Sequence, residues 1–218
     1  MVLPGFLHLS LVQAIVKPGI LIGAQNVSAH GEGAYTGEIA ADHIKDYSVH
    51  HVMIGHSERR RLFGETQEIV AQKVLEAEDC DLGILYCLGE TKEDREQENM
   101  EQVMTEQLEA LKCANIQKWQ NVVLVYEPLW ALNTGTIASA DQTQEACQFI
   151  RCWVRQNIGA EQAEAVRIVY GGSVTETNAD KLIELPDNDG FMIGSTSTKP
   201  IFRTIFEIVN GHIGREQW

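Results

Sequence analysis

Short apolar segments of strand character alternate with amphipathic helical segments along the whole chain, and few residues separate them. The expected strands lie at residues 20–25, 51–55, 82–88, 121–126, 166–170 and 190–193. The expected helices lie at residues 6–16, 40–47, 67–79, 93–112, 141–156, 178–183 and 200–209. Strands and helices in regular alternation are typical of right-handed βαβ units. The sequence therefore predicts an α/β fold built on a parallel sheet.

Polar or glycine residues follow each of the expected strands. They are Gln25-Asn26, Gly55-His56, Gly89-Glu90, Glu127, Gly171-Gly172 and Gly194-Ser195. In a parallel α/β fold the carboxyl ends of the strands meet at one face, and ligands bind there. Six such positions favour a barrel over an open sheet, although periodicity alone leaves both architectures open.

The composition is that of an ordinary globular protein with an acidic surface. The 218 residues are enough for one domain with a full core, and no linker or low-complexity tract divides them. The formal net charge of −14 argues against a general nucleic-acid surface or an anionic membrane surface. A small anionic ligand stays possible, because backbone N–H groups and helix N-termini bind anions locally.

Cysteine usage and targeting signals bear on the compartment. The five cysteines are scattered and form no CxxC pair, which suits thiols in a reducing compartment rather than a disulfide framework. Cys147 and Cys152 are poor candidates for a metal site, and no other metal site is expected. No run approaches the length of a transmembrane helix, and the N-terminus lacks a basic n-region with a cleavage site. We therefore expect a cytoplasmic protein, although a removed targeting segment would leave no trace.

One carboxylate stands at the end of the fourth expected strand. Glu127 follows the apolar run directly, and Pro128 stops the strand because it lacks an N–H and biases its neighbour towards an extended conformation. A charge at the mouth of a buried strand is costly unless it has a partner or a chemical task. The next loop carries Leu129, Trp130 and Leu132, which indicates either a lid over a ligand or a helix-entry loop with its Trp in the core.

His56 follows a buried strand and precedes Ser57 and Glu58, which resemble the first turn of a short helix. The positive end of a helix would keep the imidazole neutral near neutral pH, so that it acts as an electrophile rather than a cation. A lone histidine usually does no more than cap a strand. Arg59 and Arg60 beside it favour a site, because such a charged cluster needs partners.

Two successive strand–glycine–serine turns indicate a phosphate site. They are YGGSV at residues 170–174 and FMIGSTS at residues 191–197. Glycine allows close approach of the backbone, and serine adds a hydroxyl and an N–H, so a phosphate can be held without lysine. In a barrel, the turns after the last two strands are the place where a phosphate is expected.

The segments GAYTGEI, GHSERR, CLGE, YEPLWALNTG, VYGGSV and DGFMIG occur in the order and approximate spacing of the triosephosphate isomerase family. The chain resembles that family from about residue 4 onwards. The resemblance implies a TIM (β/α)8 barrel and a proton transfer between two carbons of a triose phosphate, without cofactor or metal. It also implies that Glu127 is the base, His56 the neutral electrophile at the carbonyl, and Glu90 a carboxylate beside the site. These roles come from the resemblance alone.

The same resemblance extends to the phosphate, the lid and a partner subunit. Residues 129–136 resemble the family's lid, in which Asn133 stands where a backbone N–H reaches the phosphate. Ser173, Gly194 and Ser195 resemble the phosphate cradle. Thr36 lies near the tip of a loop that, in the family, reaches into the active site of a partner subunit. The resemblance therefore implies a homodimer.

The family begins with a strand that carries an asparagine and a lysine, and this chain matches it only from the end of the second strand. We therefore expect a single TIM-barrel domain over residues 1–218 that lacks the first strand, the first helix and most of the second strand. Lys17 lies beyond the core of the next helix and cannot take the role of the family's lysine. Losing such a group should cost several orders of magnitude in rate, by analogy with roughly 10²–10³ for one oxyanion donor.

Three substitutions fall on the implied lid and phosphate positions. Asn133 replaces a glycine whose N–H reaches the phosphate, Thr136 replaces a lysine at the second hinge of the lid, and Ser195 replaces a glycine of the phosphate turn. Together they indicate relaxed selection on catalysis. The residues retained at other implied positions are His56, Glu90, Glu127, Ser173 and Thr36.

Two functions stay open. The first is an isomerase that interconverts dihydroxyacetone phosphate and glyceraldehyde 3-phosphate in glycolysis and gluconeogenesis. The second is a catalytically impaired pseudoenzyme that serves as a structural or binding subunit, with an assembly partner over the open barrel edge. Another phosphate-binding barrel, such as an aldolase or epimerase, is disfavoured because Lys199 follows the last strand and does not sit on one.

Overall fold

The computed structural model describes residues 1–132 and 134–216, so Asn133 lies outside the described residues. The chain divides into two compact units. Unit 1 comprises Met1–Cys87 with Glu106–Val123, and unit 2 comprises Leu88–Thr105 with Leu124–Trp218. Three elements run from one unit into the other: β3 (Gly83–Leu88), β4 (Val122–Tyr126) and α6 (Met100–Cys113). That both units form one domain stays a prediction.

The strands of unit 1 are parallel. They are β1 (Gly23–Ala24), β2 (His51–Ile54) and most of β3. Gly23 is level with His51 in the register of β1 and β2, and His51 is level with Gly83 in the register of β2 and β3. Val2 adds an isolated parallel bridge to Ile22. The strands predicted at residues 51–55 and 82–88 are confirmed.

Unit 1 also contains several helices. They are η1 (Phe6–His8), α1 (Leu9–Ile15), α2 (Ala41–Asp46), α3 (Ser57–Leu62), α4 (Gln67–Asp79) and η2 (Trp119–Asn121). Thr66 caps α4, because its hydroxyl accepts a hydrogen bond from the Ile69 N–H at 3.4 Å. Val70 and Val74 of α4 are fully buried, as is Val52 of β2, on which α4 packs. This apolar contact fixes the strand that leads to the first candidate residue of the site.

Unit 2 continues from β4 to β5 (Arg167–Tyr170). The Gly171 N–H donates to the Tyr126 carbonyl at 2.7 Å, so the chain leaving β5 is tied to the end of β4. Tyr170 forms a parallel bridge with Phe191. Leu124 is fully buried and contributes to the core of this unit. The predicted strands at residues 121–126 and 166–170 are confirmed within one residue at their starts.

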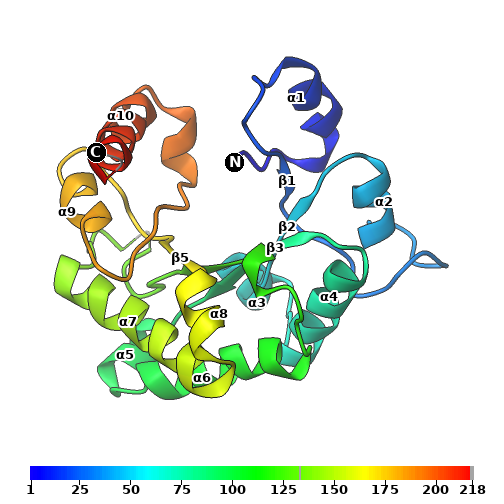
Figure 1. Ribbon diagram of the computed structural model, residues 1–218. Coiled ribbons are helices and arrows are strands. Elements are labelled where there is room, and N and C mark those ends of the chain that lie inside the picture. The colour runs from blue at the N-terminus through cyan, green and yellow to red at the C-terminus, as the bar shows by residue number, and fades with distance from the viewer. Residues whose placement is uncertain (133, 217–218) are drawn as a thin grey trace. The chain divides into compact units, whose positions relative to one another are not determined.

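Two of the helices of unit 2 begin at capping boxes. The helices of this unit are α5 (Lys92–Glu96), α7 (Ala140–Asn157), α8 (Ala160–Ala165), α9 (Ala179–Ile183), η3 (Ser195–Thr198) and α10 (Ile201–Glu216). Thr91 with Asp94 closes a capping box on α5, and Ser139 with Gln142 closes another on α7. Helix α7 packs on β5, α8 and α9 (Figure 1).

The strands follow one another in the sheet in chain order, β1-β2-β3-β4-β5. Helical segments separate each strand from the next along the chain. Sequential strands joined through helices are the arrangement that right-handed βαβ crossovers produce. The predicted α/β fold is confirmed.

Some predicted boundaries differ from the structure. The strands expected at residues 20–25 and 190–193 shrink to the two residues of β1 and to the bridge at Phe191. The helix expected at residues 93–112 is divided into α5 and α6, because Glu98 between them has a φ of 58° in the left-handed region. Helix α8 was not predicted, since Ala163 is its one buried residue and no apolar stripe marks it.

The longer helices are amphipathic. Helix α7 has 18 residues and α10 has 16. Within the residues that the structure describes, no helix combines the length and the apolar composition that crossing a membrane requires.

Candidate active site

Glu127 directly follows the last residue of β4, and only 2% of its surface is exposed. Its backbone N–H donates to the Leu88 carbonyl at 2.8 Å, which ties it to the end of β3. Gly89 passes so close that a Cβ there would collide with the Glu127 carbonyl oxygen. The glycine of the CLGE segment is therefore required for this approach, and it brings Glu90 beside the same strand end.

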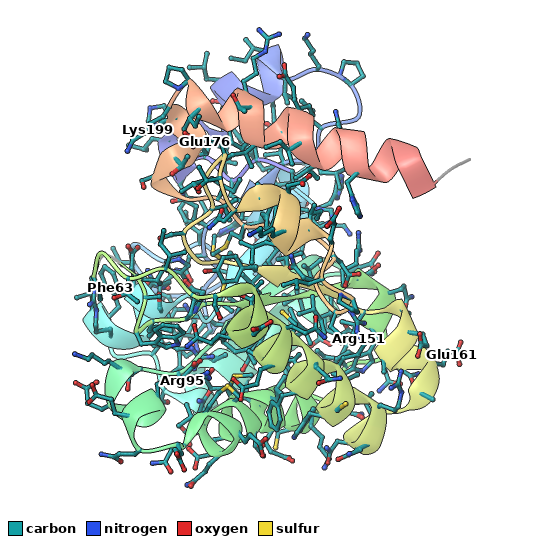
Figure 2. All side chains as sticks on the ribbon, turned by 90° about the vertical axis from the view of Figure 1, so that its left-hand side faces the viewer. Phe63, Arg95, Arg151, Glu161, Glu176 and Lys199 are labelled. Carbon is teal, nitrogen blue, oxygen red and sulfur yellow. The ribbon has the colours of Figure 1, made fainter. Side chains whose placement is uncertain are left out.

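Glu90 is fully buried and has three partners in unit 2 (Figure 2 labels one of them, Arg95). Its Oε1 accepts hydrogen bonds from the Trp130 Nε1–H at 2.7 Å and from the Tyr126 hydroxyl at 3.0 Å. Arg95 Nη1 lies 3.6 Å from the same oxygen. Among the described residues, Oε2 has no hydrogen-bond partner. Burial raises the pKa of the Glu90 carboxyl, although its hydrogen bonds and Arg95 act in the opposite direction.

The predicted lid segment begins beside Glu90. The Leu129 N–H donates to the Glu90 carbonyl at 3.2 Å, and the Ala131 N–H donates to the Pro128 carbonyl at 2.9 Å. Trp130 is half-buried, with its indole bound to the Glu90 side chain, so it lies neither in the core nor free on the surface. The later residues Thr134, Gly135 and Thr136 are exposed. The prediction for Asn133 falls outside the described residues.

The two glycine–serine turns leave β5 and the neighbouring chain at matched positions. Tyr170 and Phe191 are paired in parallel, so the turn that contains Ser173 and the turn that contains Gly194 follow adjacent strand positions. The Ser173 carbonyl accepts a hydrogen bond from Asn178 Nδ2 at 3.0 Å, which shapes the first turn. Gly194 and Ser195 are exposed, and a Cβ at Gly194 would point into open space. Backbone N–H groups in such turns can hold an anion.

His56 lies in unit 1, directly after β2, and caps α3. Its Nδ1 accepts a hydrogen bond from the Glu58 N–H at 3.3 Å. A ring nitrogen that accepts cannot carry the proton, so this geometry is that of a neutral imidazole protonated on Nε2. The Glu58 carboxylate lies 3.8 Å from the same nitrogen. His56 therefore caps the short helix that the sequence indicated after it, with Nε2 as the ring donor.

The arginines of the GHSERR segment have the partners that the sequence required. Arg60 donates to the Gly55 carbonyl at 2.6 Å and to Gln67 at 2.8 Å. Arg59 and the buried Lys73 both pair with the carboxylate of Glu65. Sequence reasoning did not identify this second cluster, because its members come from separate elements.

Thr36 lies on a long exposed loop of unit 1. The Ser28 N–H donates to the Ile39 carbonyl at 2.9 Å and closes the base of the loop. Within it, the rings of His30 and Tyr35 stack with their centroids 4.2 Å apart. Thr36 itself is exposed, and its contact with a partner subunit stays a prediction.

The predicted residues therefore fall into two groups. Glu90, Glu127, Ser173, Gly194 and Ser195 belong to unit 2, and the first two are neighbours at adjoining strand ends. His56 and Thr36 belong to unit 1. Arg95 and Tyr126 are contacts of Glu90 that sequence reasoning missed, and the position of Arg95 five residues after Glu90 was the available signal. In the described part of the chain, no group of three or more His, Cys, Asp or Glu side chains is placed to hold a metal ion.

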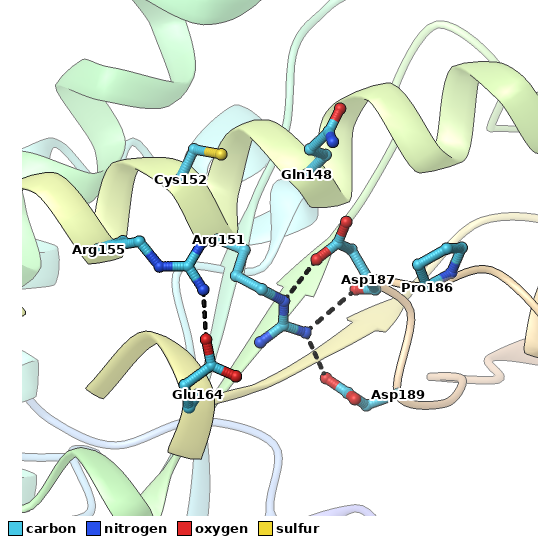
Figure 3. Close-up of a pocket in the computed structure, with 8 residues that line it drawn as sticks. All are labelled: Gln148, Arg151, Cys152, Arg155, Glu164, Pro186, Asp187 and Asp189. Atoms are coloured by element: carbon cyan, nitrogen blue, oxygen red, sulfur yellow. Dashed lines mark hydrogen bonds and ion pairs between the residues drawn. The ribbon is translucent and has the colours of Figure 1, made fainter. Parts of the chain in front are cut away.

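A polar cavity of about 370 Å³ lies elsewhere in unit 2 (Figure 3). Its lining residues are Gln148, Arg151, Cys152, Arg155, Glu164, Pro186, Asp187 and Asp189. Arg151 donates to Asp187 at 2.6 Å and to Asp189 at 2.9 Å, and so fixes the segment before Phe191 against α7. None of these residues was predicted to belong to the site. These contacts are structural, and they lie shortly before the second glycine turn in the chain.

Comparisons with known proteins agree on one family. A model of the triosephosphate isomerase family matches residues 1–210. The cytosolic triosephosphate isomerase of Oryza sativa subsp. japonica is 42% identical over 207 residues, which cover 95% of this chain and 80% of the relative. The glycosomal triosephosphate isomerase of Trypanosoma cruzi is 42% identical over 208 residues, covering 94% and 82%. The triosephosphate isomerase of Magnetococcus marinus is 46% identical over 205 residues, covering 91% and 80%.

Proposed function

The chain belongs to the triosephosphate isomerase family, and on that premise we propose that it interconverts dihydroxyacetone phosphate and glyceraldehyde 3-phosphate. The observation that carries the proposal is Glu127, a carboxylate with 2% exposure at the end of β4, directly before the lid segment. A carboxylate held in a fixed position is one of the side chains that act as general bases. The reaction needs such a group to move one proton between neighbouring carbons.

Glu127 and His56 divide the work in this proposal. Glu127 removes the proton from the carbon beside the carbonyl and returns it to the adjacent carbon. His56 donates from Nε2 to the carbonyl oxygen, in keeping with the Nδ1 that accepts from the Glu58 N–H at 3.3 Å. The negative charge that develops on the carbonyl oxygen is then stabilised by the N–H of a neutral imidazole, not by an imidazolium. Glu90 supports the arrangement from beside the strand end, where the Leu129 N–H binds its carbonyl.

The phosphate of the substrate is assigned to the two glycine turns. The chain offers Ser173 in the first turn and Gly194 with Ser195 in the second, and the exposure of the last two leaves them accessible to an anion. Backbone N–H groups hold phosphate without a permanent positive charge, which suits a chain of net charge −14. Asn133 is proposed to complete this contact from the lid.

Partners and location follow from the same membership. We infer a homodimer in which the exposed loop with Thr36 meets the partner subunit. One relative is named cytosolic and another glycosomal, and we assign this chain to the cytoplasm. Neither a cofactor nor a metal takes part in the proposed reaction.

A second candidate function is a binding or structural subunit without turnover. The observation that favours it is the outer face of η1 and α1, where Leu7, Leu11 and Ile15 are 94%, 58% and 71% exposed. Apolar side chains spaced by four residues form one stripe on a helix, and such a stripe is normally covered. A subunit that docks through this stripe would not need the proton transfer.

A coupled-dehydrogenase assay on the 218-residue chain decides between the two functions. The proposal expects formation of glyceraldehyde 3-phosphate that falls by a factor on the order of 10²–10⁴ in Glu127→Gln, because the amide cannot accept the proton. Glu127→Asp should fall less, since it only withdraws the carboxylate. Glu96→Gln on exposed α5 is the matched control and should keep the parent rate. A parent rate no higher than that of Glu127→Gln would refute the isomerase and leave the subunit function.

A further inference from the structure

Arg95 contacts Trp130, near the start of the lid segment (residues 129–136), and Glu145, which follows that segment, yet it was not among the predicted site residues. Its Nη2 donates to Glu145 Oε2 at 2.7 Å, and its Nη1 lies 3.6 Å from Glu90 Oε1. Its guanidinium carbon lies 5.6 Å from the centroid of the Trp130 ring. Trp130 is near the start of the lid, whereas Glu145 is on α7, the helix that begins shortly after the lid ends.

The start of the lid depends on Arg95 through two contacts. The Trp130 indole donates to Glu90 Oε1 at 2.7 Å, and that carboxylate has no exposed surface. A buried carboxylate is costly without a cation, and Arg95 is the cation that pairs with it among the described residues. The guanidinium also faces the indole ring itself, and a partly desolvated cation–π contact is attractive.

The other end of Arg95 is held by the helix after the lid. The Arg95 side chain is 23% exposed and the Glu145 side chain 56% exposed, so the pair is shielded on the side of Arg95. Arg95 Nη1 also lies 3.0 Å from the sulfur of Met100 on α6. A planar guanidinium with partners in several directions has little freedom to rotate. It therefore relates the position of α7 to that of Trp130.

We propose that Arg95 is a positioning residue that joins the two ends of the lid segment by holding Trp130 and α7 in a fixed relation. Movement of the lid at its first hinge must then break or reform contacts of Arg95. The kinetic consequence rests on the proposed isomerase function, whereas the structural consequence does not. Arg95 does not itself take part in the proton transfer.

The first experiment reads Trp130 directly and needs no activity. The full chain is labelled with 5-fluorotryptophan, and the Trp130 signal in the fluorine NMR spectrum is assigned with Trp130→Phe. Arg95→Ala should shift and broaden that signal, and Arg95→Lys should restore it in part because the charge is kept. Lys92→Ala, on the same helix, removes only an exposed pair with Glu96 at 3.6 Å and should leave the signal unchanged.

The signals of the buried Trp119 and Trp153 report whether each variant is folded. A Trp130 signal that is identical in folded Arg95→Ala and in the parent chain would overturn the proposal. If Arg95→Ala does not fold, Glu145→Gln replaces it, because the contacts among the described residues link Glu145 to Trp130 through Arg95. A shifted Trp130 signal in Glu145→Gln then supports the proposal, and an unchanged signal overturns it.

The second experiment measures turnover of dihydroxyacetone phosphate. Hinge contacts commonly change kcat and KM together, and a lost contact of this kind should lower kcat in Arg95→Ala on the order of tenfold. Arg95→Lys should recover part of the loss, and Lys92→Ala should match the parent. A parent chain without turnover would refute the proposed isomerase but leave the Trp130 result standing. An active parent with unchanged kcat in Arg95→Ala would overturn the kinetic role of Arg95.

Discussion

A buried carboxylate pairs with an arginine in each unit, Glu65 in unit 1 and Glu90 in unit 2, but the cations around the two carboxylates differ. The Glu65 side chain of unit 1 is 4% exposed and pairs closely with both Arg59 and Lys73. Lys73 is itself buried and donates to Asn26 Oδ1 at 2.8 Å. Glu90 of unit 2 is fully buried, and Arg95, at 3.6 Å, is the one cation that pairs with it among the described residues.

The two carboxylates differ in the number of cations that pair with them. Two cations on one carboxylate hold Glu65 in place, and burial lowers the pKa of Lys73 even though Glu65 acts to raise it. Glu90 shares its single cation with Glu145 and receives its closer hydrogen bonds from Trp130 and from a neutral hydroxyl. Burial accordingly raises the pKa of Glu90. The carboxylate that shares a single cation, Glu90, is the one beside the lid segment.

The same substitution in the two carboxylates should have unequal effects, and the larger effect is expected in unit 1. Glu65→Gln keeps the shape of the side chain but leaves Arg59 and Lys73 without an anion. Removing one partner of a buried ion pair should cost about 3–5 kcal/mol in the free energy of unfolding. Urea unfolding followed by circular dichroism measures it. Equal losses in Glu65→Gln and Glu90→Gln would show that the two sites do not differ as described.

Parts of this comparison were accessible from sequence and parts were not. The apolar run before Glu127 predicted its buried strand, because a strand hidden on both faces needs such a run. The crowded charges of Arg59 and Arg60 correctly indicated that partners exist. The identities of these partners were not predictable. Glu65 approaches Arg59, and Gln67 approaches Arg60, because the chain turns between α3 and α4.

The fold was more predictable than its margins. Periodicity located the central strands, because burial on both faces leaves a clear apolar run. It overestimated the strands at residues 20–25 and 190–193, which in the structure are reduced to two residues and a bridge. The sequence also left the place of Trp130 open between lid and core. The indole meets both descriptions in part, since its N–H binds the buried Glu90.

The intermediate effect is a pH dependence in unit 2. The pKa of Glu90 in the folded chain is raised above its ordinary value of 4.5 by burial, so the folded state binds the proton more tightly than the unfolded state. The stability that this supplies is fully present below pH 4.5 and is lost as the pH rises through the folded pKa. Glu90→Gln does not titrate there and keeps both hydrogen bonds to its oxygen.

The parent chain should therefore lose stability relative to Glu90→Gln as the pH rises through that window, and the difference should then level off. At neutral pH the two should differ by no more than about 1.5 kcal/mol, the size of one hydrogen bond. Urea unfolding of both proteins at a series of pH values measures the trend. A difference that stays constant with pH would mean that Glu90 titrates as it does in the unfolded chain.

The smallest effect is expected at an ion pair that neither unit buries. Lys92 and Glu96 are one turn apart on α5, 3.6 Å from each other, with side chains 67% and 65% exposed. Water screens such a pair, so Lys92→Ala should change the free energy of unfolding by less than about 0.5 kcal/mol. A double-mutant cycle with Glu96→Ala isolates the pair from helix propensity. A coupling well above about 0.5 kcal/mol would show that exposure to water does not decide the strength of this pair.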